Sequence, residues 1–341
     1  MNLQASGSNE PVRRIVMNIP RRQFLRLATG AAVVPAFLRS AQARPYPSRP
    51  VRIVSGFAAG SAGDIVLRVM APWLSERLGQ SFFIENRPGA AGNIGTEIVA
   101  RAPADGYTLL VVVSSSAINA TLYDKLSFNF IRDIAPVATF IRQPYVMTVN
   151  PATPAKTLRE FIAYAKGGHD KFNMASPGIG TGPHVAGELF RMMSGVDMVH
   201  VPYRGAQPAL TDLIAGQVHV SFLGITSSID HIRNGKLRPL AVTAATRSET
   251  LLDVPTIGEV VPGYEASTWV GLGAPRDTPV EIVDRLNREI SVGLNDPMIR
   301  KRFTDLGSTV FESSPAEFGR FMAAETEKWG KVVRTADIKP D

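Results

Sequence analysis

The sequence predicts an α/β fold in which mainly parallel sheets are flanked by helices. Three observations support this prediction. Short β-branched segments alternate with amphipathic helical segments, glycine-rich turns join them, and the segment Tyr107–Val113 has the apolar character of a strand buried on both faces. The alternation occurs twice along the chain, which predicts two α/β halves.

The first half begins with a strand at Val51–Val54 and a glycine-rich turn. Apolar residues then recur with helical spacing as far as Gly79, where the glycine favours the end of a helix. A strand at 81–85, a second glycine-rich turn at 88–93, a helix at 94–101 and the apolar strand at 107–113 complete this half.

The second half repeats this pattern. Strands are expected at 145–149, 172–175, 198–201, 218–222 and 237–242, and helices at 157–166, 184–193 and 207–214. The chain then becomes helical from Pro279, and a last amphipathic helix at 315–333 places Phe318, Phe321, Met322 and Trp329 on its buried face.

Two segments, 137–149 and 267–274, are expected to cross between the halves. We therefore predict a discontinuous first domain at 44–145 plus 267–341, and a second domain at 146–266. Two crossings form a natural hinge, which we expect near Tyr145 and Trp269, with Trp269 close to the hinge or cleft.

Residues 1–43 have the pattern of a twin-arginine export signal. Arg21 and Arg22 form the charged pair, a weakly apolar run follows at 27–38, and Ala41-Gln42-Ala43 is a small-x-small cleavage site. The pattern predicts a periplasmic protein cleaved near Ala43. The general secretory route stays open as an alternative to twin-arginine export.

Charge and composition narrow the class of function. Residues 1–43 hold six arginines and one glutamate, so they carry +5 of the formal net charge of +7 and leave the rest nearly balanced. No basic stripe argues for a nucleic-acid partner. The absence of cysteine excludes thiolate chemistry, and neither a cofactor nor a metal is expected. We expect a monomer.

Motifs for catalysis and nucleotide binding are missing. The run at 178–183 lacks the third glycine of GxGxxG, and the sequence contains no P-loop, HExxH or GxSxG motif. Asp64 stands at a helix start, where capping is the common role. His184 follows a glycine-rich loop, where it could either donate to an anion or serve a capping or surface role.

Four loops are candidates for a ligand site because each follows a predicted strand and is rich in Gly, Ser, Thr or Asn. Glycine lets backbone N–H groups approach a ligand, and the helix that follows aims its positive end at the same place. The alternative is that each loop is only a tight turn. The loops are Gly56–Asp64, Ser114–Asn119, Ser176–His184 and Tyr203–Ala206.

Several ordered motifs resemble the periplasmic receptors of tripartite tricarboxylate transporters, also called Bug receptors. The similarity covers nearly all of the chain after residue 43. Its motifs lie at 47–54, 63–64, 85–95, 104–109, 115–119, 182–190 and 201–218. The loop at 57–63 departs from the family's usual prolines and Gly-Gly-Gly-Thr-like run.

This resemblance implies a two-domain Venus-flytrap receptor, without enzymatic activity, that holds a small carboxylate between its domains and delivers it to membrane components of the transporter. By the resemblance, the ligand-binding positions are Phe57, Ala59, Gly60 and Ser61 in the first loop, Ser115, Ser116 and Asn119 in the next, Ser176, Gly180 and Thr181 in the opposing domain, and Tyr203, Gly205, Ala206 and Asp212 near the ligand's far end.

The sequence leaves two questions open. The first is the class of protein, because a sensor-input receptor or an exported enzyme would use the same cleft. The ligand is also open among citrate, C4–C6 dicarboxylates, amino acids and aromatic carboxylates.

Overall fold

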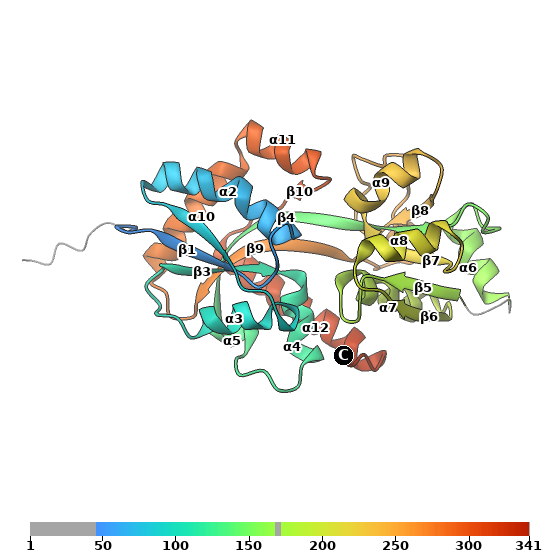
Figure 1. The fold of residues 1–341 in the computed structure, drawn as a ribbon, viewed down its shortest axis with the longest axis horizontal. Coiled ribbons are helices and arrows are strands. Elements are labelled where there is room, and N and C mark those ends of the chain that lie inside the picture. Colours follow the sequence, from blue (N-terminus) through green and yellow to red (C-terminus); the bar gives the residue numbers. More distant parts are fainter. Residues whose placement is uncertain (1–45, 168–171, 341) are drawn as a thin grey trace, which may run out of the picture. The chain divides into compact units, whose positions relative to one another are not determined.

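The computed structural model describes residues 46–167 and 172–340, so the predicted export signal lies outside the described residues. Within them, strands form one mixed sheet in the order β2-β1-β3-β9-β4-β7-β5-β6, and β8 and β10 also pair with β4. Helices flank the sheet (Figure 1). The predicted α/β alternation is present.

At one end of the sheet, three strands run parallel because helical crossovers connect them. The strands are β2 (Phe82–Asn86), β1 (Val51–Ser55) and β3 (Thr108–Val113). The helices of this part are α2 (Ala62–Leu78), α3 (Asn93–Ala100), α4 (Ser114–Leu122) and α5 (Phe130–Asp133), with a 3-10 turn at Ala90–Gly92.

The other end repeats this parallel arrangement. Its strands are β7 (Val220–Gly224), β5 (Phe172–Ser176) and β6 (Met198–Pro202). Its helices are α6 (Leu158–Lys166), α7 (Gly182–Ser194), α8 (Ala206–Ile214) and α9 (Ile225–Arg233), and a 3-10 turn lies at Ile257–Glu259.

The middle of the sheet is antiparallel and is built around β4 (Ile134–Val149). The first part of β4 pairs with β9 (Ser267–Pro275) and β10 (Thr309–Val310), and its last five residues pair with β7 and β8 (Arg238–Val242). The change of partner falls at Pro144, which has no N–H to donate to a ladder. Figure 1 shows β4 as one long green strand.

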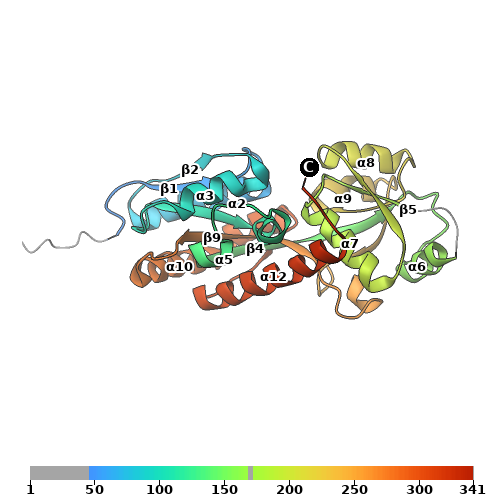
Figure 2. The same ribbon diagram turned by 90° about the horizontal axis from the view of Figure 1, so that it is seen from below.

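The C-terminal helices cover the sheet. They are α10 (Val280–Leu294), α11 (Pro297–Asp305) and α12 (Pro315–Thr335). A capping box formed by Ser314 and Glu317 begins α12, which packs on β4, α4 and α7 and runs beneath β9 and β4 in Figure 2. Among the described helices, none combines the length and apolar character needed to span a bilayer.

Some local predictions were wrong. Ser114–Asn119 is no loop, since α4 begins directly after β3. The strand expected at 145–149 is the end of the much longer β4, and α9 and α11 were not predicted. The domain boundaries stay a prediction.

A buried carboxylate joins β9 to α12. Glu325 is 6% exposed and its Oε2 accepts hydrogen bonds from the indole N–H groups of Trp269 (3.1 Å) and Trp329 (2.9 Å). Lys328 supplies the opposite charge. Trp269 also packs edge-on against Phe318, so it is a core residue of β9 rather than a residue facing a cleft.

We expect Glu325→Ala to lower the free energy of unfolding by about 2–4 kcal/mol, because two buried indole donors lose their acceptor. Glu325→Gln keeps one side-chain oxygen to which both indoles can donate, so its free energy of unfolding should fall by less. Glu327→Ala is the matched control, because it removes only an exposed ion pair with Lys331. It should change the free energy of unfolding by less than about 0.5 kcal/mol. Urea denaturation at neutral pH measures all three; equal losses for Glu325→Ala and Glu327→Ala would contradict the prediction.

Candidate functional site

The β1–α2 loop is held together by a buried aspartate. Asp64 is fully buried, and its carboxylate accepts from the Gly60 N–H (2.9 Å), from Asn86 Nδ2 (3.0 Å) and from Arg68. Burial opposes ionisation, but these hydrogen bonds outweigh it and hold the pKa of Asp64 below its usual value. Ser61, not Asp64, is the N-cap of α2.

The β5–α7 loop repeats this arrangement with a histidine. The Gly180 N–H donates to His184 Nδ1 at 3.0 Å, four residues ahead, as Gly60 does to Asp64. Gly60 and Gly180 have φ angles of 83° and 71°, a region that favours glycine. Thr181 occupies the N-cap position of α7, as Ser61 does in α2.

This anchoring changes the expected role of several site residues. The N–H groups of Gly60, Gly180 and Gly205 were candidate ligand donors, yet each already has an acceptor within the protein. Ser176 is also engaged, because its Oγ contacts Gly178 and lies 2.6 Å from His200 Nε2. The helix-start N–H groups, which have no intrahelical acceptor, are the remaining donors.

His184 is a buried neutral side chain. Its ring stacks on that of His200 with centroids 3.5 Å apart, and its Nε2 lies 3.9 Å from Glu188 Oε1. Burial, with a further contribution from His200, lowers the pKa of His184 to about 3. An Nδ1 that accepts a hydrogen bond must be unprotonated, so the loop geometry requires this neutral form.

The residues expected near the ligand's far end form a local cluster. The Tyr203 hydroxyl donates to Asp212 Oδ2 at 2.7 Å, and burial together with this bond raises the pKa of Tyr203 to about 12. Gly205 donates to the Pro177 carbonyl, which ties the β6–α8 loop to the β5–α7 loop. Ala206 begins α8.

The remaining predicted residues differ in exposure. Ser115 and Ser116 are half-buried in the first turn of α4, and Ala59 is exposed. Asn119 is buried and donates to the Ala91 carbonyl, while its Oδ1 has no hydrogen-bond partner among the described residues.

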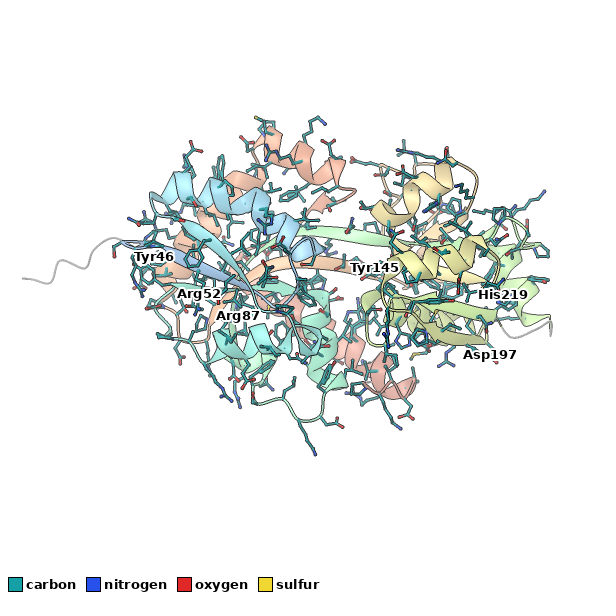
Figure 3. All side chains as sticks on the ribbon, in the orientation of Figure 1. Tyr46, Arg52, Arg87, Tyr145, Asp197 and His219 are labelled. Atoms are coloured by element: carbon teal, nitrogen blue, oxygen red, sulfur yellow. The ribbon has the colours of Figure 1, made fainter. Side chains whose placement is uncertain are left out.

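The Phe57 ring lies against Gly92, where a Cβ would come within 2.8 Å of it. Tyr145, on β4, was expected near the hinge. Its hydroxyl would lie 1.9 Å from a Cβ at Gly182, so it reaches the first turn of α7 (Figure 3).

A cavity of about 480 Å³ brings two predicted residues, Gly60 and Ala206, together. It also contains residues that the sequence reasoning missed. Thr226 and Ser227 follow Gly224 at the end of β7, a Gly-then-hydroxyl pattern that could have been recognised, whereas Gln143 lies within β4 and gave no such signal. The other lining residues are Ala62, Ile65, Val66, Ile141, Leu306 and Ser308.

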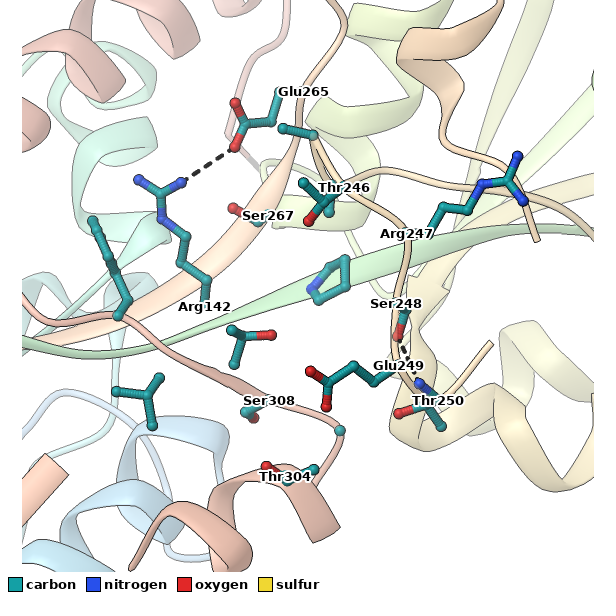
Figure 4. A pocket seen from close by; sticks show the side chains of 17 residues that line it. Arg142, Thr246, Arg247, Ser248, Glu249, Thr250, Glu265, Ser267, Thr304 and Ser308 are labelled. Carbon is teal, nitrogen blue, oxygen red and sulfur yellow. Dashed lines mark hydrogen bonds and ion pairs between the residues drawn. The ribbon is translucent and has the colours of Figure 1, made fainter. Parts of the chain in front are cut away.

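A second cavity, of about 350 Å³, contains none of the predicted residues (Figure 4). Arg142 lies on its wall, paired with Glu265 at 3.3 Å and stacked over Phe311. Its acidic and basic side chains balance, which gives it no preference for an anion.

We expect acid to destabilise the protein through His184. Folding lowers the pKa of His184. The stabilisation that the neutral side chain provides is therefore present above the pKa of the unfolded chain, about 6.5, and is lost as the pH falls toward about 3. His184→Asn keeps an acceptor for Gly180 but does not titrate. Between about pH 7.5 and about pH 5, wild type should lose about 2 kcal/mol more unfolding free energy than this variant in urea titrations. Identical losses in wild type and His184→Asn would refute the assignment.

Comparison with known proteins identifies the family. A family model described as tripartite tricarboxylate transporter family receptor matches residues 66–338. Protein BugT of Bordetella pertussis is 33% identical over 317 residues, 90% of this chain and 97% of that protein.

Two solved structures are similar over 100% of their own chains. One, an R. palustris protein with adipate, is 36% identical with a TM-score of 0.74 and covers 87% of this chain. MatC from Rhodopseudomonas palustris, with bound malate, is 33% identical with a TM-score of 0.71 and covers 84%. The predicted periplasmic-binding-protein fold class is confirmed, and the relatives are named as receptors rather than enzymes. The chain belongs to the tripartite tricarboxylate transporter receptor family.

Proposed function

We propose that this protein is a periplasmic receptor that binds a small organic carboxylate and delivers it to the membrane components of a tripartite transporter. The observation that carries this proposal is the cavity lined by Gly60 and Ala206. It lies where the β1–α2, β6–α8 and β7–α9 connections meet, at the carboxyl ends of strands, which is the usual ligand position in α/β sheets.

The helix starts supply the anion-binding chemistry. Ala62 is the first residue of α2, Ala206 is the first of α8, and Gly224 is the N-cap of α9, and all three line the cavity. Helix N-termini present unpaired N–H groups and a partial positive charge. A carboxylate at this position would accept hydrogen bonds from backbone rather than from a lysine or arginine.

The family and its ligands support the class of solute. Two relatives contain adipate and malate, both small carboxylates. A periplasmic location agrees with the family and with the export signal predicted at 1–43. The other predicted ligand residues, from Phe57 to Asp212, are proposed to surround this cavity when the receptor is loaded.

The two predicted domains are proposed to close around the ligand. We place the hinge where β4 changes partner, near Tyr145, because both halves of the sheet share that strand. A ligand that contacts both domains favours the closed form only by its differential affinity for that form.

A thermal-shift screen of carboxylates should find at least one that raises the melting temperature, since a ligand of the folded state alone stabilises it. With that compound, Ala62→Pro should weaken binding by about 1.5–3 kcal/mol, because it removes one N–H donor to a charged acceptor. Proline fits the first helical position, and Ser61 already has the extended conformation that precedes proline.

Ala62→Val is the matched control, since it adds bulk and keeps the N–H. Equal calorimetric affinity of wild type and Ala62→Pro would remove the α2 start from the site. An assay that detected conversion of the bound acid would favour an enzyme.

Small-angle scattering with and without a saturating carboxylate should show a smaller radius of gyration in the loaded protein. The reason is that each domain alone offers only part of the contacts. An unchanged radius, with binding confirmed by calorimetry on the same sample, would argue for a preformed site.

A further inference from the structure

The motif at 85–95 contacts two of the predicted ligand-binding elements, although none of its residues lines the cavity. A Cβ on Gly95 would lie 2.7 Å from the Gly56 Cα, so α3 packs directly against the start of the β1–α2 loop. The side chain of Asn119, on α4, donates to the Ala91 carbonyl at 2.9 Å. The motif therefore supports both elements without meeting a ligand itself.

Asn86, the last residue of β2, makes the side-chain contacts that hold the β1–α2 loop together. Its Nδ2 donates to the Phe57 carbonyl at 3.0 Å and to Asp64 Oδ1 at 3.0 Å. A carbonyl and an ionised carboxylate only accept, so the amide must present its nitrogen to both. One NH₂ group therefore ties the beginning of the loop, at Phe57, to its end, at Asp64.

The Asp64 carboxylate needs these donors because it is fully buried. Its cationic partner, Arg68, has a side chain that is 58% exposed, so water screens that ion pair. Asp64 Oδ1 accepts from Asn86 at 3.0 Å and from Arg68 at 3.3 Å, while Oδ2 accepts the Gly60 N–H at 2.9 Å. The Asn86 amide thus helps to keep the carboxylate ionised and in place for Gly60, which lines the cavity.

We infer that Asn86 is a positioning residue for carboxylate binding, and that it acts through Asp64 and Phe57 on the start of α2. The inference rests on the proposed function. The Asn86 amide fixes both ends of the loop, so Gly60 and Ala62 stay on the cavity wall with the unpaired N–H groups of the first helical turn. Loss of the amide would free the loop and spread those donors over several arrangements, which lowers affinity for an anion.

Asn86→Asp tests this inference because it places a second carboxylate beside Asp64. Two carboxylates at hydrogen-bond distance do not both ionise readily, so the pair keeps one proton near neutral pH. That proton bridges the two groups and holds the loop, whereas its loss leaves two charges that repel each other. The probe is adipate, which a relative contains. Calorimetry should show that the affinity of Asn86→Asp falls at least about tenfold between about pH 6 and about pH 9, while that of wild type changes less than about twofold.

Two further variants separate positioning from a general loss of stability, and melting curves at both pH values establish that each variant is folded. Asn86→Ala removes both donated bonds without adding a charge, so it should weaken adipate binding by about tenfold at either pH. Asn234→Asp is the matched control, because it makes the same exchange at an exposed position at the end of α9 and should behave as wild type. An Asn86→Asp variant with the pH dependence of wild type would overturn the inference.

A measurement without ligand distinguishes this inference from the proposed function. In ¹⁵N-glycine-labelled protein, the amide resonance of Gly60 should move between about pH 6 and about pH 9 in Asn86→Asp. In wild type it should stay fixed, because Asp64 remains ionised. A fixed Gly60 resonance in Asn86→Asp would overturn the positioning role even where adipate binds. A moving resonance, with no carboxylate bound by wild type, would support the Asn86–Asp64–Gly60 coupling and overturn the proposed function.

Discussion

The pairing of β4 is the constraint on which the rest of the structure depends. One strand of 16 residues hydrogen-bonds to β9 along its first part and to β7 and β8 along its last five residues. All the parallel strands at both ends of the sheet are attached through it, directly or through β9. Pro144 is the last residue of β4 that pairs with β9, and it has no N–H to donate at the point where the partner changes.

The two loops at the carboxyl ends of β1 and β5 are held in a similar conformation by different side chains. Each needs a left-handed glycine and an acceptor four residues later, and the acceptor is an ionised Asp64 in one loop and a neutral His184 in the other. Asp64 remains charged because Arg68 and two further donors compensate its burial. His184 has no such compensation and stays neutral, so the two loops respond differently to acid.

Those anchors also explain why the proposed site depends on helix starts. The glycine N–H groups that look free in the sequence hold the loops in shape, and the shaped loops then expose the first N–H groups of α2 and α8. Backbone donors recognise a carboxylate group without specifying what is attached to it. The wall that includes Ile65, Ile141 and the bonded Gln143–Thr226 pair has no charged side chain, so the proposed site offers only backbone and neutral groups to an acid.

The sequence alone determined the α/β class, most of the helices and strands and the family, and it indicated the strand-end loops as candidate ligand sites. These depend on local patterns such as the glycine after α2, the apolar run of β3 and the ordered motifs from 85 to 218. Tertiary structure decided which N–H groups the protein uses itself, that β4 is one strand with two sets of partners, and that Gln143, Thr226 and Ile65 share a wall. The physical reason is that hydrogen-bond satisfaction and cavity lining depend on residues distant in sequence: the Gln143 amide is oriented by the Leu306 carbonyl, 163 positions away, and no local pattern records that contact.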